Sequence, residues 1–177
     1  VQAEISEGQL AFTGEQSNDA VGKTRVTRTV SKEEVVKFEV DVNIGPDNAG
    51  RVGIRLRTKR GEVVFFRDPA DDRLKASKST GKSGFGDAVD LGPWPGAGVH
   101  AMAIDVENAR KGTVALLLDG RRLGSVTLPG IAGRQACTLM IYGQGQKLGD
   151  PVSFSVDVAR VYVRRGTKNG RRSGGGF

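Results

Sequence analysis

The chain has 177 residues, which suffices for one hydrophobic core and is short for two. Hydrophobic residues make up 37% of the sequence, a globular composition that excludes a wholly disordered chain. No apolar run approaches the roughly 20 residues of a membrane-spanning helix, so none is predicted. Because the sequence begins at Val1 without an initiator methionine, we expect a processed protein or a piece of a longer one.

The net charge of +7 is concentrated at the end of the chain. After Asp157 there is no acidic residue, whereas six basic residues follow. These six are Arg160, Arg164, Arg165, Lys168, Arg171 and Arg172. They leave 21 of the 27 basic residues against 20 acidic ones, so the rest of the chain is nearly neutral. The pattern predicts a folded domain over residues 1–165 and a basic, glycine-rich, flexible tail over residues 166–177.

Alternating apolar residues predict strands along most of the chain. The clearest strand is 35–44, where Phe38, Val40 and Val42 share one face. Further strands are expected at residues 9–13, 24–29, 51–59, 62–67, 99–106, 113–118, 121–128, 136–142 and 152–164. The first three consecutive strands after residue 30 are expected to form a meander. Asp119-Gly120 predicts a tight hairpin turn between two later strands.

Residues 68–95 differ from their surroundings, because they are polar and rich in glycine, serine and lysine. We expect a long loop here, interrupted only by a short strand near Leu74. Loops of this length are uncommon in compact domains and often carry function. No amphipathic helix is indicated anywhere. About ten short strands without helices predict two packed antiparallel sheets, and therefore an all-β sandwich.

The segment from Val99 to Ser125 carries the clearest family signal. It reads VHAMAIDV, then a polar turn, GTVALLL and DGRRLGS. This order of strand and hairpin resembles laminin-G-like and other concanavalin A-like domains, as do an opening GQLAF and a closing strand with Asp157, Arg160 and Tyr162. The resemblance implies a two-sheet jelly roll whose members bind sugars, proteins or other ligands, often as one module of a multidomain protein. It also favours an extracellular or cell-surface location.

The long loop supplies the candidate ligand-binding residues. Trp94 is framed by two prolines, and its ring is a candidate platform for stacking on a sugar. The alternative is that Trp94 plugs one end of the sandwich. Asp71, Asp72 and Asp87 add polar groups to this candidate site.

Calcium is the metal that the same loop would suit, because calcium takes carboxylate and carbonyl oxygens from loops. The candidate ligands are Asp68, Asp71 and Asp72. Their spacing matches no defined calcium loop, and neighbouring arginines and lysines offset their charge. Calcium is therefore a candidate cofactor, and no other is indicated.

Glu39 and Asp41 are the candidate catalytic carboxylates, because residues two apart on a strand point the same way. A glycosidase family on this fold has an E-x-D-x-x-E strand, but Ile44 stands at the position of its second glutamate. The alternative is that both acids pair with Arg55 and Arg57 of the next strand.

The single histidine and the single cysteine indicate structural roles. Without a second histidine or a nearby nucleophile, His100 assembles no catalytic triad and is expected to be hydrogen-bonded within the fold. Cys137 lies in an apolar stretch and is expected to be a small buried side chain that forms no intrachain disulfide.

These patterns predict a non-catalytic recognition module of a larger protein that binds carbohydrate or a protein surface. A first alternative is a structural or assembly domain whose basic tail contacts a neighbouring chain or an acidic partner. The tail residues for that contact are Arg164, Arg165, Lys168, Arg171 and Arg172. A second alternative is a glycoside-processing enzyme that uses Glu39 and Asp41. Nucleic acid is not favoured, because the tail lacks interleaved aromatic residues.

Overall fold

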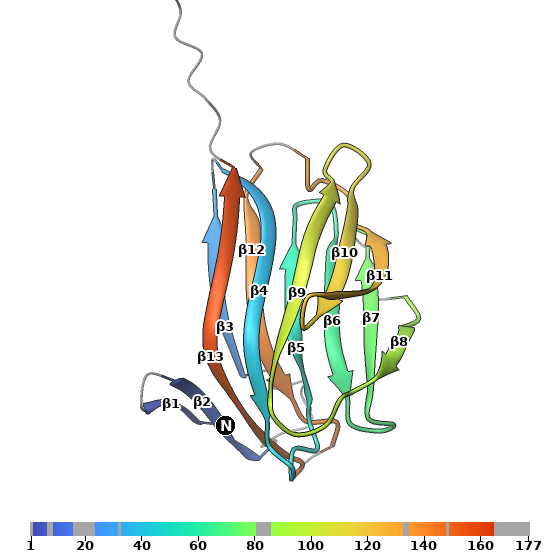
Figure 1. Cartoon of the computed structure of the whole chain (residues 1–177). Coiled ribbons are helices and arrows are strands. Elements are labelled where there is room, and N and C mark those ends of the chain that lie inside the picture. The colour runs from blue at the N-terminus through green and yellow to red at the C-terminus, as the bar shows by residue number, and fades with distance from the viewer. Residues whose placement is uncertain are drawn as a thin grey trace, which may run out of the picture.

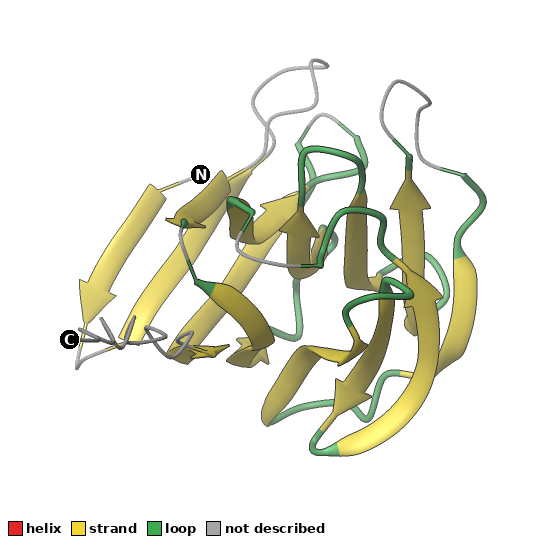
Figure 2. Cartoon of the chain, turned by 90° about the horizontal axis from the view of Figure 1, so that it is seen from above, coloured by secondary structure: helices red, strands yellow, loops and turns green. Residues whose placement is uncertain are grey.

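A computed structural model describes residues 2–6, 9–15, 24–31, 33–80, 86–132, 135–147 and 149–164. Figure 1 shows these residues as two stacked layers of strands. Figure 2, a view from above, shows strands and loops and no helix in the described part. Accordingly, nothing in these residues forms a helix that could cross a membrane.

The front layer in Figure 1 is a seven-stranded sheet, here called sheet A. Its spatial order is β1 (Gln2–Ser6), β2 (Gln9–Glu15), β13 (Pro151–Arg164), β4 (Glu34–Ile44), β9 (Val99–Asn108), β10 (Thr113–Leu118) and β11 (Arg121–Thr127). All neighbours are antiparallel. The predicted hairpin turn joins β10 to β11, where Asp119 and Gly120 both have positive φ, 51° and 77°.

The rear layer is a six-stranded antiparallel sheet, here called sheet B. Its spatial order is β3 (Thr24–Val30), β12 (Cys137–Gln144), β5 (Arg51–Arg57), β6 (Glu62–Asp68), β7 (Arg73–Ser79) and β8 (Val89–Pro93). From β5 to β8 each strand pairs with the next along the chain, so this half of sheet B is a meander.

The core lies between the sheets and is built from the inward alternate residues of both. Val40 and Ile104 contribute from sheet A, and Ile54 and Phe65 from sheet B; each is at most 1% exposed. Cys137 joins this core at 2% exposure, and burial raises the pKa of its thiol. The predicted all-β, two-sheet antiparallel sandwich is therefore confirmed.

Three expectations about the strands are wrong. β4 pairs with β13 and β9 in sheet A, so it does not begin the meander that contains β5 and β6. Residues 68–95 are not one loop, because β7 spans seven residues and β8 follows it. β1 was not expected at all. The error about β4 arises because local alternation shows that a strand exists but does not show which strand it pairs with.

Candidate ligand-binding site

The outer face of sheet B is apolar at its centre, which is unusual for a sheet face that points away from the core. On β6, Phe65 points into the core while Val64 and Phe66 point outward. On β12, Met140 and Tyr142 also point outward. These four outward side chains form a second hydrophobic cluster, and each is 4–5% exposed.

A glycine separates the two aromatic members of this cluster. Tyr142 on β12 lies opposite Gly53 on β5, and Gly53 lies opposite Phe66 on β6. A Cβ atom at Gly53 would lie 2.3 Å from the carbonyl oxygen of Phe65 and 2.6 Å from Cβ of Phe66. The position therefore requires glycine, because β6 approaches β5 too closely here for any side chain.

A pocket of about 340 Å³ occupies this part of the face. Its apolar lining comes from Val64, Phe66 and Tyr142, and its polar lining includes Arg51 and Gln144. The other polar and loop residues that line it are Arg55, Ser77, Gly86, Asp87 and Ala88. The pocket is thus shared between four strands, β5, β6, β7 and β12, and the segment that precedes β8.

Two hydrogen bonds hold the loop wall against β7. The Ser77 hydroxyl donates to the carbonyl oxygen of Gly86 at 2.8 Å. The N–H of Gly86 donates to the carbonyl oxygen of Lys78 at 3.1 Å. Because both bonds join Gly86 to strand residues, this wall of the pocket has a fixed position before any ligand arrives.

An acidic residue of β6 orients each of the two arginines of the pocket. Nη2 of Arg51 lies 3.0 Å from Oδ2 of Asp68, and Nη1 of Arg55 lies 3.1 Å from Oε2 of Glu62. The guanidinium carbon of Arg51 also lies 5.2 Å from the ring centroid of Phe66, a cation–π contact. The two guanidinium groups are therefore held in place at the pocket.

Asp68 is ionised in spite of its burial. Desolvation opposes its charge, but the N–H of Ala70, the charge of Arg51 and the ammonium of Lys75 outweigh that effect, so its pKa lies below the ordinary value. Nζ of Lys75 lies 3.2 Å from Oδ2 of Asp68. A single buried carboxylate thus serves two cations.

The predicted ligand-binding residues separate in the structure. Asp87 lines the pocket. Trp94 is 7% exposed and belongs to the main core, with its ring edge-on to His100 at 4.9 Å between centroids. Nδ1 of His100 in turn lies 2.9 Å from Oδ2 of Asp119, as befits a hydrogen-bonded histidine. The indole faces the core, which fits the alternative in which Trp94 closes one end of the sandwich.

The acids that were candidates for calcium form ion pairs instead of a cluster. Asp68 pairs with Arg51 and Lys75, and Asp71 pairs with Lys75 at 2.7 Å. Asp72 pairs with Arg67 at 2.8 Å. Within the described residues no three carboxylate, histidine or cysteine side chains come together as a metal site.

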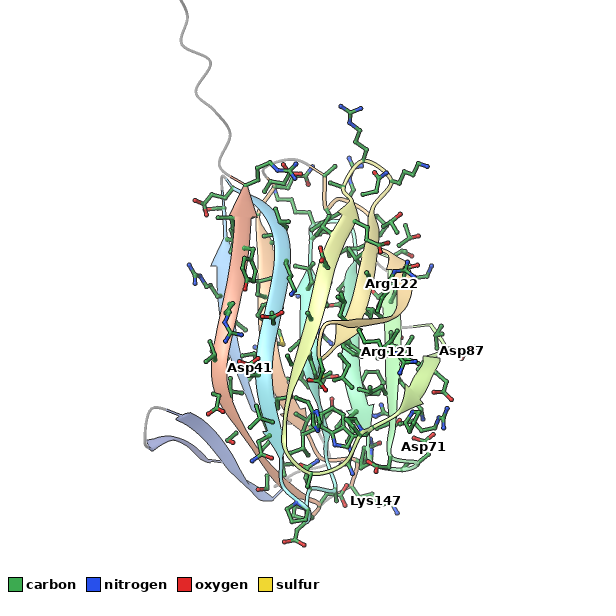
Figure 3. All side chains as sticks on the ribbon, viewed as in Figure 1. Asp41, Asp71, Asp87, Arg121, Arg122 and Lys147 are labelled. Atoms are coloured by element: carbon green, nitrogen blue, oxygen red, sulfur yellow. The ribbon has the colours of Figure 1, made fainter. Side chains whose placement is uncertain are left out.

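Glu39 and Asp41 lie on the other side of the molecule, on the outer face of sheet A. Figure 3 shows Asp41 on β4, apart from Asp71 and Asp87, which lie on the β8 side. The expected pairing with Arg55 and Arg57 is wrong, because those arginines belong to sheet B. The partner is Arg160 on β13, 3.1 Å from Glu39 and 2.9 Å from Asp41.

Glu39 is a poor general acid in this arrangement. Its hydrogen bond from Lys37 and the nearby charges of Lys37 and Arg160 hold its pKa below the ordinary value, against the effect of burial. A glycosidase acid needs a raised pKa so that it still carries a proton near neutral pH. The outer face of sheet A therefore presents a bridged charge cluster without a proton donor at Glu39.

Of the five tail residues proposed to contact an acidic partner, the structure describes one. Arg164 lies at the end of β13, and its Nη1 is 3.8 Å from Oε2 of Glu34. The other four lie outside the described residues: Arg165, Lys168, Arg171 and Arg172.

Comparison with known proteins places the fold. No protein-family model and no curated protein sequence matches the chain. Among solved structures, the Caenorhabditis elegans galectin LEC-6 is similar at 12% identity and a TM-score of 0.51, over 86% of this chain and 95% of the galectin. A laminarinase from Flavobacterium sp. UMI-01 is similar at 16% identity and a TM-score of 0.65, over 90% of this chain and 81% of the laminarinase.

A third similar structure is the catalytic domain of an endo-1,3-β-glucanase from Thermotoga petrophila RKU-1, at 15% identity and a TM-score of 0.64. It is matched over 90% of this chain and 79% of its own length. The chain therefore has the concanavalin A-like lectin and glucanase fold, as the sequence resemblance implied. That fold is shared by a galectin and by glycoside hydrolases, so the role of this chain must be argued from its own site.

Sequence reasoning missed Arg51, Phe66, Tyr142 and Gln144 as site residues. A signal for two of them was present, since a strand with apolar residues on both faces predicts that something covers its outer face. The runs Val63-Val64-Phe65-Phe66 and Leu139-Met140-Ile141-Tyr142 have this property, and they contain Phe66 and Tyr142. The neighbouring polar residues carry no local signal, because only the pairing of β12 with β5 places Gln144 opposite Arg51.

Proposed function

We propose that the chain is a non-catalytic recognition module that binds carbohydrate in the pocket on the outer face of sheet B. The observation that supports this most is a preformed hollow in which aromatic walls meet oriented polar groups. Its volume of about 340 Å³ is near the lower end of small-ligand pockets, roughly 300–1,000 Å³. One or two sugar rings are the corresponding ligand size.

The lining offers the two kinds of contact that a sugar needs. The edges of Phe66 and Tyr142 provide apolar surface for the C–H groups of a sugar ring. Arg51 and Gln144 provide hydrogen-bond donors for its hydroxyls, and Asp87 provides a carboxylate acceptor. Since the arginines and the loop wall are already held in place, little ordering cost remains for binding.

The same lining argues against glycoside hydrolysis. The two-carboxylate mechanism needs an acid on each side of the scissile bond. Asp87 is the single carboxylate among the residues that line the pocket. Residues 81–85, which complete the loop before it, contain no acidic residue in the sequence. On sheet A, Arg160 occupies both Glu39 and Asp41.

The experiment is a glycan array probed with wild-type protein and with a pocket-filling variant, Gly86→Leu. A Cβ at Gly86 has only the Lys78 carbonyl oxygen nearby, at 3.9 Å, so the larger side chain is expected to fit without strain and to occupy the pocket. Ser125→Leu is the matched control, since Ser125 is exposed on β11 in sheet A. We expect wild type and the control to bind the same glycans, and Gly86→Leu to lose at least about 90% of that signal.

Each array should be run with calcium and again with a chelator. Because Asp68, Asp71 and Asp72 are engaged by basic side chains, binding should persist in the chelator. Binding that requires calcium would instead indicate that those three acids hold a calcium ion at the binding site. Equal binding by wild type and Gly86→Leu would reject this pocket, and turnover of a bound glycan would reject the non-catalytic role.

A further inference from the structure

The charged residues that line the pocket affect which class of sugar it can bind. Among the lining residues, two are cationic, Arg51 and Arg55, and one is anionic, Asp87. Asp87 is exposed on the loop wall, whereas the arginines project from β5 in the sheet itself. The sheet side of the pocket is therefore the positively charged side.

Arg51 differs from Arg55 in how accessible its side chain is to a ligand. Its side chain is 39% exposed, compared with 11% for Arg55, so a ligand can reach it. Its Nη2 contacts Asp68, but its Nε is buried and has no hydrogen-bond acceptor. Because Nε is covered by the protein, a ligand reaches Arg51 at the exposed part of its side chain.

The charge of Arg51 is also incompletely balanced. Its acidic partner, Asp68, is shared with Lys75 at 3.2 Å and with the N–H of Ala70 at 3.2 Å. The Asp68 side chain is 4% exposed and does not line the pocket, so it positions the guanidinium without occupying the space open to a ligand. The ring of Phe66 fixes the guanidinium from another side.

Resting on the proposed function, we infer that the pocket selects anionic sugars, with Arg51 binding a carboxylate or sulfate group of the glycan. Guanidinium groups suit such anions because their planar N–H donors match the oxygens of carboxylate and sulfate. Asp87 on the opposite wall is left to accept hydrogen bonds from hydroxyls of the same sugar. Arg51 is thus the residue that sets specificity.

The test is an array of matched neutral, uronic-acid-containing and sulfated oligosaccharides, followed by titrations at about 0.05 M and about 0.5 M NaCl. We expect the bound glycans to carry carboxylate or sulfate, and their affinity to fall at the higher salt concentration. The two anion types in the array distinguish a uronate from a sulfate ligand. Binding of neutral glycans with equal or higher affinity would overturn the inference and leave the proposed function intact.

Arg51→Gln should lower the affinity for the anionic glycan at least about tenfold and should remove most of its salt dependence. Arg121→Gln is the control, because Arg121 is exposed on β11 in the front sheet (Figure 3). Since loss of Arg51 leaves buried Asp68 with one cation fewer, the double variant Arg51→Gln/Asp68→Asn provides a second measurement in which neither partner remains unpaired.

Three outcomes separate the two proposals. If both Arg51 variants bind the anionic glycan as wild type does, the inference is wrong and the pocket recognises the glycan by other groups. If both lose only anionic binding, the inference holds. If no glycan binds to wild type at all, the proposed function fails and the inference fails with it.

Discussion

The outer faces of the two sheets differ in the side chains that point away from the core. On the outer face of sheet A, the acids Glu39 and Asp41 of β4 are bridged by Arg160. On the outer face of sheet B, the central residues of β6 and β12 are aromatic or aliphatic and are buried, and the arginines of β5 lie beside them. The charges of Glu39 and Asp41 are neutralised by an ion-pair partner on the same face, whereas the apolar part of sheet B lines a pocket that a ligand can enter. The comparison is the reason why the proposed binding site lies on sheet B, although the sequence had drawn attention to the acids of sheet A.

The largest difference in stability between the two faces should appear when one aromatic residue on each is replaced by alanine. Phe66→Ala on sheet B should lower the free energy of unfolding by about 3 kcal/mol, because a buried ring is lost and a cavity remains. Tyr162→Ala on sheet A should cost less than about 1 kcal/mol, since Tyr162 is 46% exposed. Denaturant unfolding measures both. If both variants lose a similar amount of free energy of unfolding, the outer face of sheet B is not more tightly packed than that of sheet A.

Adding a methyl group to the sheet B floor should have the next largest effect. Gly53→Ala places a Cβ against the backbone of β6 and should destabilise the fold by about 2 kcal/mol. The control is Gly86→Ala, whose Cβ would make only an ordinary contact at 3.9 Å with the Lys78 carbonyl oxygen, and which should change stability by less than about 0.5 kcal/mol. If thermal unfolding shows Gly53→Ala to be as stable as wild type, the close approach of β5 and β6 is not a constraint.

Removing the bridge on sheet A should have a smaller effect. Arg160→Gln leaves Glu39 with Lys37 and deprives Asp41 of its cation, but both acids keep access to water at this face. We expect a slight loss of stability, smaller than either sheet B variant, and no change in glycan binding. If Arg160→Gln alters glycan binding, sheet A contributes to recognition, and the proposed difference in role between the two faces is wrong.

The smallest effect concerns pH. Because the hydrogen bond from Lys37 lowers the pKa of Glu39 in the folded protein, Glu39 contributes stability above its unfolded pKa, and that stability is lost as pH falls through the folded pKa. The slope should therefore appear below about pH 4. Glu39→Gln should flatten this slope in unfolding experiments across the acidic range. An unchanged slope would assign the acid sensitivity to other carboxylates, such as Asp68.

Much of the fold could be predicted from the sequence, because alternation is a local property. The strand at residues 35–44 and the Asp119-Gly120 turn were predicted from neighbouring residues alone. β7 was largely missed, since its outward residues are lysine and serine and its inward ones include Ala76, so neither face reads as strongly apolar. The pocket could not be predicted, because Gly53 separates Tyr142 from Phe66 only through pairings across three strands.

The reaction rate of the buried Cys137 thiol can be used to measure opening of the β-sandwich. It is the only cysteine in the chain, it is 2% exposed, and burial keeps its thiol protonated. An alkylating reagent reacts with the thiolate, so modification of the native protein requires separation of the two sheets around Cys137, which lies in the core between them. The rate of labelling thus measures the free energy of that separation, independently of any ligand assay, and every variant above can be compared by it.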